Sequence, residues 1–77
     1  MNFYETVLCA CKRSGITITS LTQQLGISKA NIRNWKDGVI PKFSVRLRIA
    51  QITGISLRDI LTPEEFNSYN SMSKEQL

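Results

Sequence analysis

The sequence predicts one small all-α domain: a compact bundle of five helices, or six if the C-terminal residues add a short one. Three observations predict this fold class. Apolar residues recur at helical spacing in segments that end at glycines and a proline, and no run alternates apolar and polar residues for long enough to form a strand. The 77 residues are 42% hydrophobic and 21% charged, which suits a folded domain with a single modest core.

The first two helices are predicted from their ends. Phe3, Val7, Ala10 and Cys11 recur at helical spacing, and the helix is expected to stop at Ser14-Gly15, where Gly15 can take the left-handed conformation. Thr17 is suited to N-cap a second helix over about residues 18–25, which Gly26 ends. The second helix is therefore expected to be barely two turns long.

A third helix is predicted over about residues 29–36, with Ser28 as its N-cap and Gly38 at its end. Ile32 and Trp35 lie three residues apart, so both are expected to turn toward the core; a surface anchor for a partner is the alternative for Trp35. The second and third helices are expected to meet at a steep angle through a tight glycine-containing turn and to share one core.

Pro41 prevents the third helix from continuing, and apolar residues at helical spacing predict a fourth helix from Phe43 to Gly54, which closes it. Ser56 is expected to cap a fifth, short segment over residues 57–61. Asp59 falls in its first turn, where a carboxylate is favoured by the positive end of the helix dipole.

The C-terminal residues begin with Thr62-Pro63-Glu64-Glu65, the order of a capping box with proline at the first helical position. A last turn or two of helix is expected through Tyr69, after which the polar end of the chain should fray. Phe66 and Tyr69 either pack back on the body or take part in a dimer contact, and the sequence leaves both open. We assign residues 1–61 to the folded domain and 62–77 to a short acidic tail.

The net charge of +4 is unevenly distributed along the chain. Acidic residues outnumber basic ones from Asp59 onward, whereas before it the only acidic residue after Glu5 is Asp37. The basic residues of the body are Lys12, Arg13, Lys29, Arg33, Lys36, Lys42, Arg46, Arg48 and Arg58. A basic body favours a polyanion as partner, although helical charges often form only a solvated face. Arg46 and Arg48 are expected to be solubilising residues.

The sequence lacks the residues that several classes of function need. No stretch approaches the roughly 18 apolar residues of a membrane helix, and the N-terminus shows neither a basic leader nor a cleavage site, so a cytoplasmic protein is expected. Cys9 and Cys11 are badly placed to bridge, and without histidine they make no metal site, so reduced structural thiols are expected. No Ser or Cys is paired with a base for nucleophilic catalysis. Glu64 and Glu65 are adjacent in the sequence and so do not face each other across a cleft as an acid and base pair would. We expect no enzyme, cofactor or small-molecule ligand.

The outer face of the third helix carries a stripe of cations. Lys29, Arg33 and Lys36 lie at positions i, i+4 and i+7, with Ala30 and Asn34 beside them. An α-helix fits the major groove of B-DNA, where Lys and Arg donate to guanine, Asn pairs with adenine, and an Ala methyl contacts the thymine methyl. From the residues alone, two interpretations of this stripe stay open: contact with duplex DNA and a plain solvated face.

Residues 3–61 resemble the Cro and CI-type phage repressor helix-turn-helix family, also called the xenobiotic-response-element family. The resemblance is carried by "ITSLTQQLGISKANIRNWKDG" followed by "PKFSVRLRIAQITGISLRDIL". Trp35, Gly38 and Pro41 extend the match beyond a bare helix-turn-helix. The chain departs from the family at Ile18, where Gln is frequent, and at Thr22, where Ala is frequent.

The resemblance implies a lambda-repressor-like helix-turn-helix fold with the third helix as the recognition helix. Carried over by position, the residues expected to read bases are Ser28, Lys29, Ala30, Asn31, Arg33 and Asn34, with Asn31 at the margin. Those expected to contact phosphates are Thr17, Thr19, Lys36, Lys42, Phe43 and Ser44.

The same resemblance implies a function. It predicts a small Cro-like repressor of phage or bacterial type that binds duplex DNA as a homodimer on a pseudo-palindromic operator. The alternative is a protein-interaction module, an anti-repressor or adaptor that keeps the fold without binding DNA.

Overall fold

The structure is a computed structural model that describes residues 2–76, with side chains described from Asn2 to Ser71. Met1 and Leu77, which the predicted domain boundaries include, lie outside the described residues. Within the described range the chain is all-helical and has no strand, as predicted. The helices are α1 (Phe3–Ser14), α2 (Ile18–Leu25), α3 (Ala30–Lys36), α4 (Phe43–Thr53), α5 (Leu57–Ile60) and α6 (Pro63–Gln76).

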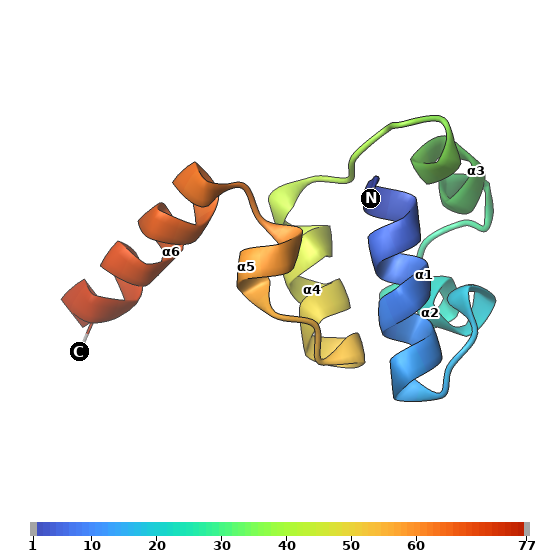
Figure 1. Ribbon diagram of the computed structural model, residues 1–77, viewed down its shortest axis with the longest axis horizontal. Coiled ribbons are helices and arrows are strands. Elements are labelled where there is room, and N and C mark those ends of the chain that lie inside the picture. The colour runs from blue at the N-terminus through green and yellow to red at the C-terminus, as the bar shows by residue number, and fades with distance from the viewer. Residues whose placement is uncertain (1, 77) are drawn as a thin grey trace.

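One core holds the first five helices together. Trp35 from α3 is 1% exposed, and the ring of Phe3 meets it edge-on at 5.5 Å between centroids. Figure 1 shows α1 to α5 gathered around this core, while α6 extends away from the body beyond α5. The buried cluster consists of Val7, Cys11, Leu21, Trp35, Ile49, Ala50, Ile60 and Leu61. The predicted burial of Trp35 is confirmed.

The predicted ends of α1 and α2 are confirmed. Gly15 and Gly26 both take the left-handed conformation, with φ of 74° and 72°. The Thr17 hydroxyl accepts a hydrogen bond from the Ser20 N–H at 3.0 Å, which is the N-cap expected from its position. These ends follow from interactions within a few residues, so the local sequence sets them.

The start of α3 differs from the prediction by one residue. The helix begins at Ala30, and Lys29 takes helical angles without a side-chain cap. Ser28 still acts on this end, because its hydroxyl accepts a hydrogen bond from the Ala30 N–H at 3.1 Å. The first turn closes with tight bonds, from the Asn31 N–H to the Ser28 carbonyl and from the Ile32 N–H to the Lys29 carbonyl, before the wider α pattern starts.

Ile32 departs further from the prediction. It is only half-buried, and it is not among the described half-buried residues that pack against the core cluster. The reason is the shortness of α3, in which Trp35 alone reaches the centre. α3 therefore contributes Trp35 alone to the core, whereas the three-residue spacing of Ile32 and Trp35 predicted two inward side chains.

α4 and α5 lie close to their predicted positions. α4 ends at Thr53, and Gly54, the predicted stop, takes the left-handed conformation with φ of 75°. The Ser56 hydroxyl accepts a hydrogen bond from the Arg58 N–H at 3.2 Å and so caps α5 as predicted. Leu61 is extended rather than helical, and its side chain is buried in the core.

The capping box at the start of α6 is confirmed, but the helix is longer than predicted. The Glu65 N–H donates to the Thr62 hydroxyl at 3.1 Å, and the Thr62 N–H donates to the Glu65 carboxylate at 3.0 Å. α6 does not stop near Tyr69 but continues to Gln76. Once the box has formed the first turn, each further residue adds one backbone bond, so the helix can continue past Tyr69 without an apolar face.

Phe66 of α6 and Arg46 of α4 help to attach α6 to the body. Phe66 packs against the core cluster, which is one of the two alternatives that the sequence left open. Arg46 is not the solvated residue predicted: it is 8% exposed and paired with Glu65. The pattern of charge along α4 could not reveal this, because the partner lies 19 residues away in the sequence.

Candidate nucleic-acid interface

The turn between α2 and α3 sets the direction of α3. The Gly26 N–H bonds to the Gln23 carbonyl and the Ile27 N–H bonds to the Thr22 carbonyl, both at 3.1 Å, which ends α2 in a Schellman-type pattern. Leu21 of α2 is fully buried in the same core as Trp35 of α3. With Trp35 inward, the opposite side of α3 faces solvent.

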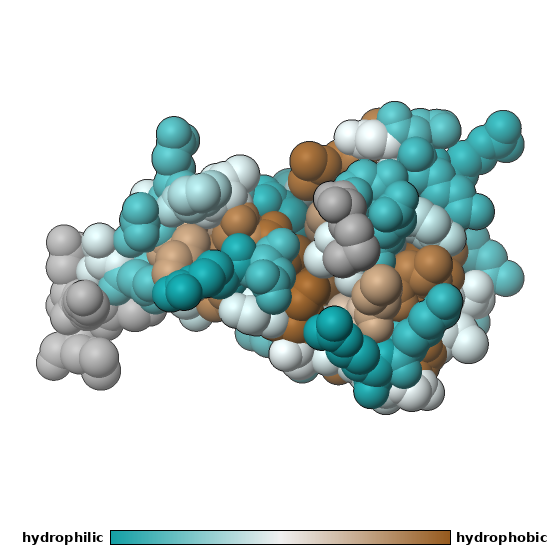
Figure 2. Space-filling view, viewed as in Figure 1, coloured by the Kyte–Doolittle hydropathy of each residue, from teal (hydrophilic) through white to brown (hydrophobic). Residues whose placement is uncertain are grey.

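The exposed side of α3 is polar and cationic. Ser28, Lys29, Ala30, Arg33, Asn34 and Lys36 are exposed, and Asn31 is half-buried. No hydrogen bond, ion pair or aromatic contact joins the side chain of Lys29 or Arg33 to the described residues. Figure 2 shows hydrophilic side chains covering the part of the molecule that α3 forms. The structure therefore brings the predicted base-reading residues together with Lys36, a predicted phosphate contact, on the same short segment.

Two of these residues are already engaged within the chain. The Asn31 side-chain amide donates to the Ser28 carbonyl at 3.0 Å, and the Ser28 hydroxyl accepts from the Ala30 N–H. Their side chains are therefore held close to the backbone at the start of α3. The marginal place that the resemblance implies for Asn31 stays a prediction.

Lys36 lies at the other end of α3 and points toward α1. Its ammonium nitrogen is 5.3 Å from the centroid of the Tyr4 ring, within the range of a cation–π interaction. The side chain remains exposed, so this contact directs the cation without burying it. Tyr4 is a residue that the sequence reasoning did not connect with the interface.

The start of α4 offers a second group of polar atoms. Lys42 and Ser44 are exposed, whereas Phe43 is half-buried and packs against the core. The N–H groups of Val45 and Arg46 bond to the Lys42 carbonyl, and no side chain caps this end of the helix. Phe43 and Ser44 are the first helical residues, so the helix offers no carbonyl to which their N–H groups could donate. A helix start of this kind can bind an anion.

At the start of α2 the two predicted phosphate contacts differ. Thr17 is exposed, although its hydroxyl oxygen already accepts from Ser20, and Thr19 is half-buried. Thr22, one of the departures from the family, is fully buried and its hydroxyl donates to the Thr19 carbonyl at 2.7 Å. The extra polar atom is thus satisfied inside its own helix.

Two exposed apolar residues follow α3 and were not singled out from the sequence. Val39 and Ile40 are 55% and 60% exposed in the connection between α3 and α4. They are two adjacent apolar residues between Gly38 and Pro41, which is the signal that could have drawn attention to them. They adjoin both groups of polar residues in the chain.

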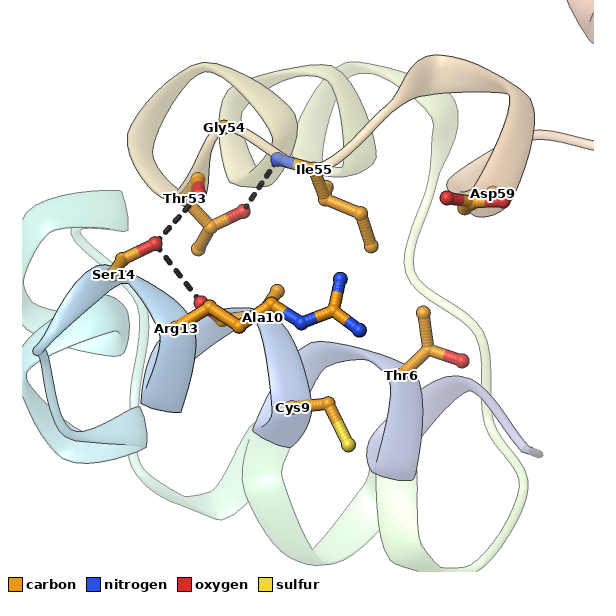
Figure 3. A pocket seen from close by; sticks show the side chains of 9 residues that line it. All are labelled: Thr6, Cys9, Ala10, Arg13, Ser14, Thr53, Gly54, Ile55 and Asp59. Atoms are coloured by element: carbon orange, nitrogen blue, oxygen red, sulfur yellow. Dashed lines mark hydrogen bonds between the residues drawn. The ribbon is translucent and has the colours of Figure 1, made fainter.

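A cavity of about 470 Å³ lies between α1 and the turn that joins α4 to α5, and no residue of α3 lines it. Figure 3 shows the Arg13 guanidinium extending across this cavity, with Asp59 at the far end. The Ser14 hydroxyl donates to the Thr53 carbonyl at 2.6 Å and ties the two walls together. The lining residues are Thr6, Cys9, Ala10, Arg13, Ser14, Thr53, Gly54, Ile55 and Asp59. The sequence did not predict this cavity.

Both cysteines are free thiols. Cys9 is half-buried at the edge of the cavity, and Cys11 belongs to the core, where burial raises the pKa of its thiol. Among the described residues, no group of three or more potential metal-binding side chains comes together. None of the described helices has the length and apolar character needed to cross a bilayer.

Comparison with known proteins gives one match. Residues 10–65 match the family described as Cro/C1-type HTH DNA-binding domain. The match includes α2, α3, α4 and α5 whole. No curated protein and no solved structure matches the chain.

Proposed function

The chain belongs to the Cro/C1-type HTH DNA-binding domain family, and from this we propose that it is a small sequence-specific repressor that reads the major groove of duplex DNA with α3. Membership of the family establishes the coarser description, a helix-turn-helix domain of the DNA-binding type. The sequence specificity, the repression and the roles of individual residues are the proposal.

The observation that carries the proposal is the exposed face of α3. Trp35 is buried behind it, while Lys29, Arg33 and Asn34 face solvent. Lysine and arginine can donate to guanine O6 and N7, and asparagine can pair with adenine N6 and N7. The Ala30 methyl suits a thymine methyl group, and Ser28 and Asn31 supply hydroxyl and amide groups at the start of the helix. A major groove matches this set of side chains.

Phosphate contacts would fix the orientation of α3 in the groove. Lys36 sits at the end of the helix, and Lys42 stands beside the free N–H groups of Phe43 and Ser44 at the start of α4. Thr17 and Thr19 supply weaker, neutral contacts at the start of α2. These groups donate hydrogen bonds or carry positive charge, which suits a phosphate backbone.

The length of α3 favours a homodimer. A helix of 7 residues is about 10 Å long and spans about three base pairs, too few to define an operator. Two copies related by two-fold symmetry would read a pseudo-palindromic site whose half-sites lie about one helical turn apart. Bound there, the dimer would repress by blocking polymerase.

Selection of duplexes from a random pool tests the proposal. We expect enrichment of two inverted half-sites about one turn apart, because a two-fold dimer reads the same bases twice. The control is Lys12→Ala, which removes one exposed cation from α1 and leaves α3 unchanged. It should enrich the same site, whereas Arg33→Ala should lose preference within each half-site. A pool that stays unenriched would contradict the proposal and favour the protein-interaction module.

A further inference from the structure

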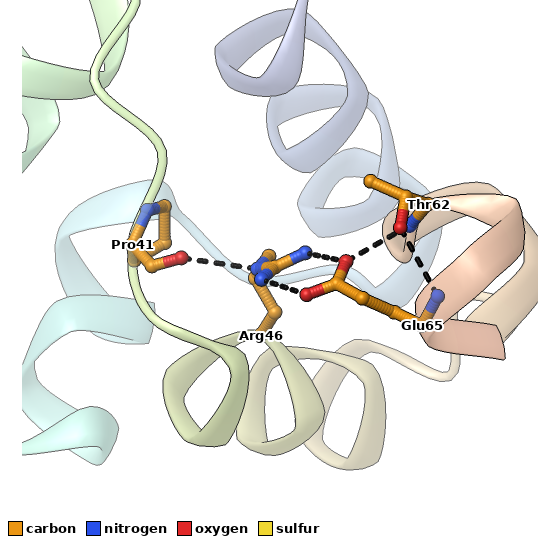
Figure 4. A network of polar contacts seen from close by, with 4 residues as sticks. All are labelled: Pro41, Arg46, Thr62 and Glu65. Atoms are coloured by element: carbon orange, nitrogen blue, oxygen red, sulfur yellow. Dashed lines mark hydrogen bonds and ion pairs between the residues drawn. The ribbon is translucent and has the colours of Figure 1, made fainter. Parts of the chain in front are cut away.

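A bidentate ion pair joins α4 to α6. The two terminal nitrogens of Arg46 each donate to one oxygen of Glu65 at 2.6 Å. The Arg46 Nε–H donates to the Pro41 carbonyl at 3.0 Å, and Glu65 also accepts from the Thr62 N–H at 3.0 Å. The Arg46 and Glu65 side chains are 10% and 28% exposed. Figure 4 shows these four residues as one network.

The network joins three segments of the chain, and Glu65 lies 19 residues from Arg46 in the sequence. Pro41 belongs to the connection after α3, Arg46 to α4 and Glu65 to the first turn of α6. A guanidinium is planar and rigid, so bonds on three of its nitrogens fix the relative positions of all three segments. Glu65 of α6 therefore helps, through Arg46, to fix the connection between α3 and α4.

Pro41 directly precedes the candidate phosphate site at the start of α4. Its carbonyl belongs to the same peptide unit as the Lys42 nitrogen, so fixing that carbonyl fixes where Lys42 begins. Lys42 is extended, with φ of −65° and ψ of 163°, and directs the chain into α4. A shift of Pro41 would move both the Lys42 cation and the first N–H groups of α4.

We propose that Arg46 and Glu65 are positioning residues for DNA binding, which hold the start of α4 in the place where Lys42 and the adjacent N–H groups meet a phosphate. The inference rests on the proposed function. It goes beyond that function because it makes α6, through Glu65, part of the DNA-binding unit. Neither residue touches DNA in this account.

Folding does not by itself require such a pair. Desolvation of a buried and a half-buried charge offsets much of their attraction, and apolar side chains of similar volume often serve stability as well. What the pair adds is directional: two parallel hydrogen bonds to one carboxylate and a third to Pro41. A role in orientation accounts for this geometry.

The direction in which a charge-changing substitution shifts DNA affinity distinguishes a positioning role from an effect of net charge. Glu65→Gln removes one negative charge, which should tighten DNA binding if only net charge matters. The positioning role predicts the reverse: binding about threefold to tenfold weaker, in the range of coupling between residues of one network. The matched control is Glu64→Gln, since Glu64 is exposed and bonded to no described side chain. It should bind as tightly as the wild type or more tightly.

Binding is measured by fluorescence anisotropy on the duplex that the wild-type chain selects, with circular dichroism to confirm folding at the assay temperature. Arg46→Met/Glu65→Gln serves as a second variant, because it leaves the net charge unchanged and gives the Arg46 position an apolar side chain. We expect it to be folded and to bind about threefold to tenfold more weakly than the wild type.

A further measurement separates positioning from a structural role. Lys42→Ala should reduce the salt slope of binding by about 1 for each contact in the wild-type background. In the Arg46→Met/Glu65→Gln background the same substitution should have a smaller effect, because Lys42 is no longer held at its phosphate. Equal effects in both backgrounds would overturn the inference.

The failures of the two proposals are distinguishable. If the wild type binds no duplex, both fall. If the wild type binds and Glu65→Gln is as tight as Glu64→Gln, the positioning role alone is wrong.

Discussion

Basic residues in this protein differ in what their side chains contact. Arg46 is paired with Glu65, Lys36 and Arg58 lie over aromatic rings, and the Arg48 guanidinium donates to the Gln24 carbonyl at 3.4 Å. Lys29 and Arg33 have no such contact among the described residues, as noted above. A cation that is unengaged in the free protein keeps its donors available for a partner. Substitution of these two residues is therefore the most direct test of base reading.

Lys29→Ala and Arg33→Ala should each weaken binding by about 1 to 3 kcal/mol and relax the preference at one base pair, because each removes donors to a base edge. Lys42→Ala should weaken binding to all duplexes alike, since a phosphate carries no sequence information. Competition titrations with single-base variants of the selected site measure both effects. Uniform losses for all three substitutions would show that the base-reading assignment is wrong.

Glu65 predicts a specific dependence of stability on pH. Hydrogen bonds from Arg46, and then from the Thr62 N–H, hold the pKa of Glu65 at about 2, below its ordinary 4.5. The unfolded chain binds a proton at higher pH than the folded one, so stability falls as the carboxylate is protonated. The contribution of Glu65 is complete above about pH 4.5 and is lost as the pH falls toward 2.

Urea unfolding of the wild type and of Glu65→Gln between pH 7 and pH 2 measures this contribution. The wild type should be the more stable of the two at neutral pH, and the difference should shrink below about pH 4.5. Glu64→Gln serves as the comparison, because Glu64 has no partner among the described side chains. A difference between wild type and Glu65→Gln that is constant with pH would contradict the role of the ionised pair.

At the scale of the element, α3 depends on its packing more than on its own helix propensity. Seven residues are too few for a stable isolated helix in water, so the tertiary contact of Trp35 must hold α3 in place. Phe3 of α1 meets the Trp35 ring edge-on, which links the recognition surface to the first helix. The orientation of α3 is therefore a property of the core.

Trp35→Ala should lower the free energy of unfolding by about 3 to 5 kcal/mol, because it leaves a large cavity where the ring was. Urea unfolding followed by circular dichroism measures the change. Val39→Ala is the control, since this residue is exposed next to α3 and its substitution should stay within about 0.5 kcal/mol. Equal effects of the two substitutions would argue against Trp35 as the anchor of α3.

The whole molecule has a basic body and an acidic C-terminal part, with a net charge of +4. Glu65 lies in that acidic part but is bonded to the body, so the charge asymmetry of the sequence does not divide the structure into independent parts. The boundary at residue 61 stays a prediction. Figure 1 shows that α6 begins at the body and points away from it.

Binding to DNA should weaken steeply as salt rises, because each neutralised phosphate releases counterions. If two copies together neutralise about six phosphates, affinity should fall roughly a thousandfold between about 50 and 200 mM salt. Anisotropy titrations at four or five salt concentrations measure the slope. Lys12→Ala should leave it unchanged, and a flat response of the wild type would argue against phosphate-anchored binding.

The helices could be predicted from the sequence because their ends are local. The caps at Thr17, Ser56 and Thr62 and the left-handed glycines each involve residues within a few positions, so a single sequence reveals them. The exposure of Lys29 and Arg33 could be predicted from their positions relative to Trp35 on one helix, once Trp35 was expected to be buried.

Three features differ from what the sequence predicted. Arg46 looked like a surface charge until Glu65 and Pro41 were brought to it; Ile32 matched a core position that the short α3 does not fill; and α6 runs further than its polar composition suggested. For Arg46 the deciding partner, Glu65, lies 19 residues away in the sequence, and no local pattern encodes it. Helix caps are readable along the chain because hydrogen bonds close within one turn, whereas the burial of a charge is settled by which segments the core draws together.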